Sequence, residues 1–345
     1  MSEFRRRLMM QGGASGGKYI KFKDPVVEQI CISKWSSDGI GLTPEDAANV
    51  TDIGTTFTNN TEITSFTELP MFGINKISER AFYNCTNLFE LTLFEGITKI
   101  EQRAFSFAPI KELYIPSTLS YVSGEHAFTG VKLETLIVGD LDSWLKIAVD
   151  GVGDMYNLPN VNSSNIVVIG KEEYLNYVVP SDIDEIPYFR LCKFPIKCLD
   201  SGNVKTISKS AMQYSAVERV VLNSVDTIES SAFQSCELLV SVIGIENVTS
   251  LGDRAFVFCS NLSNPIQINP SILQIKEYTF SGCNKVPYFD FRSHEQVPSL
   301  LNVNGMSNST IVVPDELYDQ WIVATNWESL KSQIVKASEF VEPNE

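Results

Sequence analysis

The chain has 345 residues, of which 43% are hydrophobic and 10% aromatic, a composition that supports a packed interior and argues against general disorder. Its net charge of −15 disfavours nucleic acid and anionic membrane surfaces as partners. The longest apolar runs, such as 166–169, are only as long as a β-strand, so we expect no membrane-spanning helix and no membrane insertion.

The segment 1–24 differs in charge from the rest of the chain. Six basic residues, among them Arg5, Arg6 and Arg7, stand against two acidic ones, and Gly and Ser follow where a secretory signal would have its apolar core. We interpret this segment as a flexible basic arm with a Gly/Ser linker, and expect no signal peptide and a cytoplasmic location before assembly. Such an arm is either a solvated tail or a segment whose three arginines dock onto a partner assembly.

Residues 25–69 are predicted to form an N-terminal helical cap. Thr43 suits the N-cap of a helix over 44–49, because a proline and two acidic residues follow in its first turn. The overlapping segment 36–46 also resembles a decayed calcium loop, but it is one residue short and has Ile40 where an oxygen ligand is needed. We favour the helix over the calcium site.

The pair Ala-Phe then recurs along the chain at a nearly constant spacing. The aromatic positions 82, 105 and 128 follow one another at intervals of 23, and positions 212, 233, 256 and 280 follow at intervals of 21, 23 and 24. Each pair is followed by apolar positions at fixed distances, and the alternation of Leu91 and Leu93 is typical of a short strand with one buried face. Because one such unit cannot bury its apolar face alone, we predict that residues 70–310 stack into a solenoid with a period of about 23 residues.

The repeat is degraded between Phe128 and Met212. Residues 179–186 match residues 115–122 in pattern, so at least one coil persists there. The stretch 141–165 contains several Gly and Asn residues and is predicted to be a divergent insertion. We expect the fold to continue through it.

Residues 311–345 are predicted to be a C-terminal cap made of a strand and a helix. The apolar run 311–313 reads as the last strand, Pro314 precedes a helix that begins near Asp315, and a second helical turn follows over 326–334. A helix at this place would cover the otherwise bare end of the apolar array.

The pattern Ile-x-x-x-Ala-Phe-x-x-Cys-x-x-Leu-x-x-Leu-x-Leu/Ile resembles the BspA-like leucine-rich repeat family. Residues 77–93, 228–245 and 275–291 carry it most fully. The resemblance implies an α/β repeat, a curved leucine-rich-repeat solenoid with helical caps at both ends, used for adhesion or protein binding and without enzymatic activity. The terminal segments 1–10 and 310–327 resemble proteins of anaerobic gut bacteria and, for the first of them, of their phages.

The side chains that most often carry chemistry are explained by the repeat itself. Cys85, Cys236, Cys259 and Cys283 each lie three residues after the phenylalanine of their coil, and are therefore separated by at least one whole coil. This spacing predicts a ladder of small buried residues and not a metal site. Cys192 and Cys198 flank a proline and could pair, but we favour two thiols. The histidines His126 and His294 belong to no recognisable catalytic motif. We therefore predict a protein that is not an enzyme and has no cofactor and no metal.

Binding is expected on the sheet face that stacking creates. Side chains of a strand alternate, so the residues flanking each inward apolar position point outward. These candidate ligand-binding residues are Glu90, Thr92, Glu112, Tyr114, Thr135, Ile137, Arg219, Val221, Ser241, Ile243, Tyr288 and Asp290. The row mixes apolar and charged residues, which suits a protein or polysaccharide ligand, although an ordinary solvated face would look the same.

Two functions follow from these observations. In the first, the chain is a binding or adhesion protein on a virion or a bacterial cell surface, recognising a host surface protein or glycan as an appendage of a phage or prophage particle. In the second, it is a structural protein that decorates or bridges an assembly, with Arg5, Arg6 and Arg7 anchoring it to other virion or assembly proteins.

Overall fold

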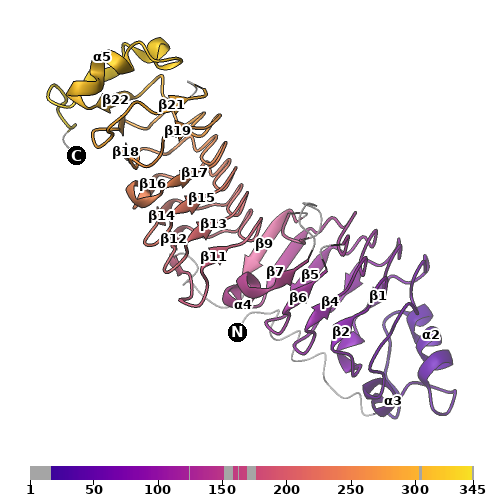
Figure 1. The fold of residues 1–345 in the computed structure, drawn as a ribbon. Helices are drawn as coiled ribbons and strands as arrows, with labels where there is room; N and C mark the ends of the chain where they lie inside the picture. Colours follow the sequence, from indigo (N-terminus) through magenta and orange to yellow (C-terminus); the bar gives the residue numbers. More distant parts are fainter. Residues whose placement is uncertain are drawn as a thin grey trace. The chain divides into compact units, whose positions relative to one another are not determined.

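The computed structural model describes residues 17–123, 125–150, 158–161, 163–168, 176–302 and 305–343, and the candidate docking residues Arg5, Arg6 and Arg7 lie outside these ranges. The chain divides into two compact units, Met1–Gly170 and Lys171–Glu345, here called unit 1 and unit 2. Each unit is a parallel β-solenoid, in which every coil contributes short strands to sheets that run along the array (Figure 1).

Unit 1 contains two parallel sheets whose strands alternate in the sequence. The five-stranded sheet consists of β1 (Ser65–Phe66), β3 (Glu90–Leu91), β5 (Glu112–Ile115), β7 (Thr135–Val138) and β9 (Asn165–Val168). The four-stranded sheet consists of β2 (Lys76–Ile77), β4 (Lys99–Ile100), β6 (Tyr121–Val122) and β8 (Ala148–Val149). The helical elements among the described residues of this unit are α2 (Pro25–Trp35), α3 (Pro44–Ala48), η1 (Leu69–Met71) and α4 (Leu141–Lys146).

Unit 2 repeats this plan with four sheets. One face carries β10 (Asn176–Val178), β12 (Cys198–Asp200), β14 (Arg219–Val221) and β16 (Ser241–Ile243), and then β18 (Ile266–Gln267), β20 (Tyr288–Asp290), β22 (Thr310–Val313) and β23 (Ile334–Lys336). The other sheets are β11 (Glu185–Ile186), β13 (Thr206–Ile207), β15 (Thr227–Ile228) and β17 (Ser250–Leu251), and the pair β19 (Gln274–Ile275) and β21 (Ser299–Leu300). In the described part of this unit, the helical elements are η4 (Ile245–Asn247), η5 (Asp315–Leu317), α5 (Tyr318–Trp321) and η6 (Trp327–Leu330).

The phenylalanines of the Ala-Phe pairs stack on one another inside each unit. In unit 1, ring centroids are 5.8 Å apart for Phe82 and Phe105, and the planes differ by only 4°. In unit 2 the Phe233 and Phe256 rings are 5.1 Å apart with a difference of 2°. These distances are close to the spacing of neighbouring strands, so in these coils one ring per coil fills the interior without a gap. The adjacent backbone also links coils, because the amide of Phe82 donates to the carbonyl of Ala104 at 2.8 Å.

The cysteine ladder predicted from the sequence has a hydrogen-bonding role. Each buried thiol donates to the backbone carbonyl of the stacking residue one coil earlier, at 2.9 Å for Cys85 to Phe57 and at 3.1 Å for Cys236 to Met212, Cys259 to Phe233 and Cys283 to Phe256. Burial raises the pKa of Cys85 and of Cys236 to about 12. Cys192 and Cys198 form no disulfide in the described part of the chain.

The coils differ in length, so the period of about 23 residues predicted from the sequence is not constant along the chain. In unit 2, Asn176 pairs in register with Cys198 and Cys198 with Arg219, so the first of these two coils is one residue longer than the second. In unit 1, Thr135 pairs with Asn165, which makes this coil much longer than either. It contains the predicted insertion near 141–165, where α4 and β8 are found, and β8 continues the sheet of β6.

The α/β class predicted for the repeats is wrong in its helical part. In the described ranges the repeats are built mostly from strands and turns. A coil of about 22 residues that already holds two strands and the Ala-Phe turn has too few residues left for a regular helix.

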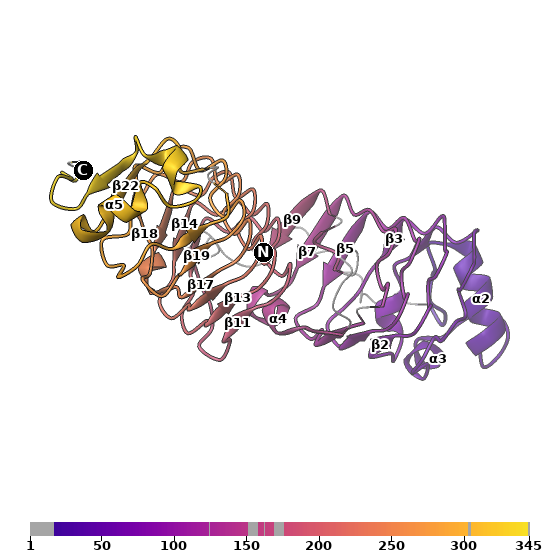
Figure 2. The same cartoon turned by 45° about the horizontal axis from the view of Figure 1, so that its top comes forward.

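Helices α2 and α3 precede the first coil of unit 1, and Figure 2 shows α2 outside the coils at the indigo end. The buried carboxylate of Asp24 joins α2 to that coil. Its Oδ1 accepts the amides of Val26 and Val27 at 2.8 and 3.2 Å, and its Oδ2 accepts the amides of Thr64 and Ser65 at 2.6 and 3.2 Å. One side chain therefore both caps the helix and binds the strand β1.

Helix α3 begins at Pro44, as predicted, with a capping box between Thr43 and Asp46. In the preceding loop, which resembles a calcium loop, the Asp38 carboxylate is occupied by protein donors. It accepts the amide of Ile40 at 2.9 Å and the Lys18 ammonium and the Tyr19 hydroxyl at 2.8 Å each. Hydrogen bonds from Lys18 hold the pKa of this carboxyl well below its usual range.

At the end of unit 2, two tryptophans pack against the last coils. Trp321 and Trp327 lie 5.3 Å apart, and each is within 5.4 Å of Phe291. The indole nitrogen of Trp327 donates to the carbonyl of Pro298 at 2.7 Å. His294 is buried beside Trp321, and neither of its ring nitrogens has a hydrogen-bond partner among the described residues.

Candidate functional site

Four of the predicted outward residues of unit 2 lie side by side on β14 and β16. Arg219 pairs in register with Ser241, and Val221 with Ile243. Arg219 is exposed and Ile243 is 44% exposed, whereas Val221 and Ser241 are half-buried. Together they form a continuous strip across two strands, as the alternation rule predicts.

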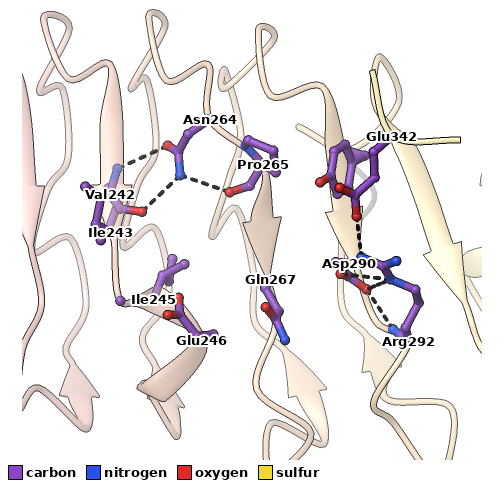
Figure 3. Close-up of a pocket in the computed structure, with 12 residues that line it drawn as sticks. Val242, Ile243, Ile245, Glu246, Asn264, Pro265, Gln267, Asp290, Arg292 and Glu342 are labelled. Carbon is purple, nitrogen blue, oxygen red and sulfur yellow. Dashed lines mark hydrogen bonds and ion pairs between the residues drawn. The ribbon is translucent and has the colours of Figure 1, made fainter. Parts of the chain in front are cut away.

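The strand ladder is interrupted next to this strip, between β16 and β18. The side chain of Asn264 takes the place of a strand: its Oδ1 accepts the amide of Val242 at 3.1 Å and its Nδ2 donates to the Val242 carbonyl at 2.9 Å (Figure 3). The same Nδ2 donates to the carbonyl of Pro265 at 2.9 Å. A side-chain amide has the donor and the acceptor of a peptide group, so the backbone of Val242 is satisfied without a neighbouring strand.

The interruption has a simple origin in the sequence. The spacing from the first apolar position of a coil to the inward strand residue is three in 239–242 and in 286–289, but four in 262–266. The extra residue lies at Asn264-Pro265, directly before β18. Proline has no amide hydrogen to give to a ladder, which also favours a break at this point.

A groove of about 360 Å³ occupies this break (Figure 3). It is lined by Val242, Ile243, Gly244, Ile245, Glu246, Asn264, Pro265, Gln267, Tyr288, Asp290, Arg292 and Glu342. The turn at Gly244 has a φ of 85°, and a Cβ there would lie 2.2 Å from the carbonyl oxygen of Leu222. Only glycine fits this close approach, and the turn leads into η4 at the edge of the groove.

The far wall of the groove is a network of charged side chains. The Arg292 guanidinium donates from Nε to Asp290 at 3.0 Å and from Nη2 to Asp290 at 2.7 Å and Glu342 at 2.9 Å. The hydrogen bonds to Asp290 raise the pKa of Arg292 above its usual value. Burial raises the pKa of Tyr288, and the carboxylates of Glu342 and Asp290 add to this effect.

Two side chains of the groove remain unpartnered. Within the described residues, neither the Glu246 carboxylate nor the Gln267 amide makes a hydrogen bond or an ion pair, and both residues are exposed. The two Nη1 hydrogens of Arg292 are also unused, since its described hydrogen bonds come from Nε and Nη2. The groove therefore offers donors and acceptors to a ligand.

Tyr288 and Asp290, which the alternation rule places on the outward side of β20, are covered by another part of the chain. Tyr288 is only 9% exposed and Asp290 only 7%. The cause is the segment 337–343, here called the C-terminal strap, which returns to the face of β20. Its Phe340 ring lies 4.8 Å from the ring of Tyr288, and its Glu342 pairs with Arg292. Both residues still line the groove, on the wall that the strap completes.

Tyr114 and Ile137 on unit 1, also predicted to point outward, are only 9% and 6% exposed. The Tyr114 hydroxyl donates to Glu95, and a Cβ on Gly139 would touch that hydroxyl at 2.7 Å. Ile137 lies in register between Tyr114 and Val167 on the neighbouring strands. Burial opposes ionisation of Glu95, but hydrogen bonds from Tyr114 and from the 117–118 turn outweigh it and lower its pKa.

Three of the remaining predicted residues of unit 1 are the first residues of the inner strands β3, β5 and β7 of its five-stranded sheet, and Thr92 directly follows β3. Glu90 and Glu112 are exposed register partners, and the Glu90 carboxylate pairs with Lys23. Thr135, the next partner in that row, is half-buried, as is Thr92. These four residues line neither of the concavities described here, and their role in binding stays a prediction.

A second, smaller concavity of about 180 Å³ lies on the other sheet of unit 1. It is lined by Glu79, Lys99, Glu101, Gln102, Tyr121 and Ser123. Lys99 pairs with Glu101 at 3.6 Å and lies over the Tyr121 ring, 4.7 Å from its centroid. The charged groups of this concavity thus pair with one another to a larger extent than the charged groups of the groove do. In the ranges that the structure describes, no cluster of three or more His, Cys, Asp or Glu side chains is arranged to hold a metal ion.

Most of the residues that line the groove were not predicted from the sequence. The alternation rule selected Ile243, Tyr288 and Asp290 but not Glu246, Gln267, Arg292 or Glu342. The prediction included no outward pair from the coil of β18, whose pattern has the extra residue. That irregular spacing is the signal that could have located the groove.

Comparison with known proteins supports the fold. A model of the BspA type leucine-rich repeat region matches residues 45–140 and 177–317, in six copies. No curated protein sequence gives a significant match. No helix among the described residues is long and apolar enough to cross a membrane.

Several solved structures are similar at low identity. A leucine-rich repeat protein from Eubacterium ventriosum is 18% identical, with 70% of each chain covered and a TM-score of 0.41. One from Bacteroides ovatus is 14% identical, with 82% of this chain and 86% of that chain covered and a TM-score of 0.40. A leucine-rich cell surface protein from Faecalibacterium prausnitzii is 19% identical, with 83% and 82% covered and a TM-score of 0.33.

Proposed function

The chain belongs to the BspA type leucine-rich repeat family, and from this premise we propose that it is a non-enzymatic binding protein that uses the face of unit 2. The observation that carries the proposal is the groove at the β16–β18 break, where Glu246, Gln267 and Arg292 offer unused hydrogen-bonding groups. The exposed strip on β14 and β16 extends this surface by two strands. Ligand sites combine such a concavity with a few convergent polar groups.

The ligand in this proposal is a protein or a polysaccharide on a host surface. The protein itself is displayed on a virion, as a phage or prophage appendage, or on a bacterial cell surface. The support for this location is the resemblance of residues 1–10 to proteins of gut bacteria and their phages, and of residues 310–327 to proteins of gut bacteria. The acidic body of the chain, with a net charge of −15, agrees with a partner that is neither nucleic acid nor anionic lipid.

We also propose that the chain consists of four segments, 1–24, 25–69, 70–310 and 311–345. The second and the fourth of these segments cap the two ends of the repeat array. Helices α2 and α3 would close the first coil through Asp24 and through Trp35, whose ring lies 5.7 Å from Phe72. Helix α5 and η6 would close the last coil through Trp321 and Trp327. A repeat array needs such ends because its terminal coils expose an apolar surface.

Binding of the full chain to immobilised mucin and to immobilised bacterial envelopes, measured by surface plasmon resonance, tests the proposed function. We expect one of these surfaces to retain the protein, and the double variant Glu246→Gln/Gln267→Ala to lose that retention. Gln274→Ala is the matched control, because Gln274 is exposed on β19, in the other row of sheets of unit 2. Equal retention of all three proteins, or retention of none, would refute binding through the unit 2 face.

The structural alternative makes a different prediction. If residues 1–17 anchor the protein to an assembly, their deletion abolishes incorporation into particles and leaves the solenoid folded. Quantitative mass spectrometry of purified particles measures that incorporation. Unchanged incorporation of the deletion variant would remove the alternative.

A further inference from the structure

We propose that the groove binds an oligosaccharide whose sugars are neutral or carry amino groups. The proposal rests on the proposed function, since it names the ligand class for the same site. It commits to a sugar chain in place of a protein, and it places that chain along the break between η4 on one side and Arg292 on the other.

The first argument is the balance of donors and acceptors in the groove. A sugar hydroxyl donates one hydrogen bond and accepts others at the same time, so it needs both kinds of group nearby. Glu246 supplies acceptors, Arg292 supplies donors through Nη1, and the Gln267 amide supplies one of each. The Tyr288 hydroxyl makes no described hydrogen bond and can act in either sense.

Part of the groove is apolar, and this part suits the C–H face of a sugar ring. Pro265 is exposed and Ile243 is 44% exposed, on the side of the groove that adjoins the strip. Figure 3 shows both residues among the polar side chains of the lining. A pyranose has the same mixture, with hydrogens on its faces and hydroxyls around its rim. A ligand that is apolar throughout would instead leave Glu246 and Gln267 buried without partners, which costs free energy.

Charge decides which sugars fit. The groove holds the three carboxylates of Glu246, Asp290 and Glu342 against the single guanidinium of Arg292. The wall pair of Asp290 and Arg292 is already joined through hydrogen bonds from Nε and Nη2 to the carboxylate. An excess of negative charge repels uronate and sulfated chains, while it tolerates neutral sugars and attracts ammonium groups.

A peptide strand is the less suitable occupant. Strand addition needs an edge with unpaired backbone amides and carbonyls. At the break, Asn264 occupies both backbone groups of Val242, and Ile243 accepts the amide of Leu222 on the other side at 2.8 Å. The edge of β16 therefore has little to offer a peptide backbone, whereas the side chains that face the groove are unused.

Isothermal titration calorimetry with defined hexasaccharides tests the proposal on the full chain. The probes are hexamers of glucose, mannose and galactose, a glucosamine hexamer, and a galacturonate hexamer as the acidic counterpart. We expect saturable binding of at least one neutral or amino probe and none of the acidic one. Gln267→Ala should weaken that binding about 5-fold and Glu246→Gln about 10-fold, because a charged partner makes the stronger hydrogen bond. Gln274→Ala should change nothing, and circular dichroism verifies that all variants are folded.

Three results would overturn the proposal: binding of no hexamer, binding of the galacturonate hexamer alone, or sugar binding that the groove variants leave unchanged.

Failure of the sugar proposal can be separated from failure of the proposed function by treating the mucin and envelope surfaces with periodate or with a protease. If retention depends on Glu246 and Gln267 but survives periodate oxidation of the glycans and is lost after proteolysis, the ligand is a protein. The proposed function then stands without the sugar. If retention never depends on the groove, both fail.

Discussion

Replacing Asp24 by alanine should detach helix α2 from the first coil. The side chain is 3% exposed, so water does not replace its hydrogen bonds readily. Loss of the N-cap costs about 1 kcal/mol. The buried amide of Ser65 loses its acceptor, which costs a further 1 to 3 kcal/mol, roughly. We discount the Thr64 amide, because Thr64 lies at an exposed position. The expected total is about 3 kcal/mol, or about 100-fold in the local opening equilibrium.

Hydrogen exchange followed by mass spectrometry measures this opening segment by segment. In Asp24→Ala, the amides of α2 and β1 should exchange about 100-fold faster, while peptides from unit 2 keep their rates. Asp24→Asn keeps the shape and one acceptor oxygen, so its effect should be intermediate. Asp315→Ala is the control, because Asp315 is an exposed carboxylate of unit 2 that accepts the amide of Ser338. A change of less than about threefold in α2, or equal acceleration everywhere, would refute the reasoning.

The same carboxylate predicts a dependence on pH. Burial opposes the ionisation of Asp24, but the hydrogen bonds from Thr64, Val26 and Val27 outweigh it and lower its pKa. The folded form therefore binds its proton less readily than the unfolded form, whose pKa is about 3.9. The stabilisation is present above about pH 4 and is lost as the pH falls through the folded pKa. The stability advantage of the wild type over Asp24→Ala in unit 1 should therefore shrink as the pH falls from 7 to below 4, and an advantage that stays constant in acid unfolding would contradict the lowered pKa.

Three further predictions concern buried groups. Burial lowers the pKa of His294, so the tryptophan cluster should lose stability as the pH falls below about 6.5, and His294→Phe should remove that dependence in tryptophan fluorescence. The Cys85 thiol, whose pKa is raised to about 12, should react with a thiol reagent at pH 8 only after unfolding, whereas the half-buried Cys198 reacts in the native protein; equal native rates would contradict this. Gly244→Ala should destabilise unit 2 by about 2 kcal/mol or more in urea denaturation, because of its positive φ and the Leu222 carbonyl; an unchanged midpoint would argue against the turn geometry.

The repeat could be predicted from the sequence because the same apolar core positions recur in each coil. The spacing of Phe82, Phe105 and Phe128 reports directly on the stack of rings. Burial across the sheet could not be predicted in the same way. Tyr114 alternates correctly with its inward neighbours, yet Glu95 and Gly139 cover it from other parts of the unit. Alternation fixes the side of a strand on which a residue lies, and it does not tell what else packs on that side.

The groove was beyond the sequence prediction for a related reason. Its near wall depends on a departure from the period, the extra residue at Asn264-Pro265. Its far wall depends on the C-terminal strap, which reaches Tyr288 and Arg292 from about fifty residues further along the chain. A search for regularity leaves out both features, since neither belongs to the repeat.

The side chain of Asn264 suggests how such arrays change their specificity. An added residue in a coil would normally leave a strand with unpaired backbone groups, and stability would select against it. Here a single asparagine supplies what the missing strand would have given. Length changes confined to one coil thereby become neutral steps, and each opens a new recess whose lining is free to vary. Insertion, and not only substitution, is then a route by which a repeat protein can follow a changing receptor.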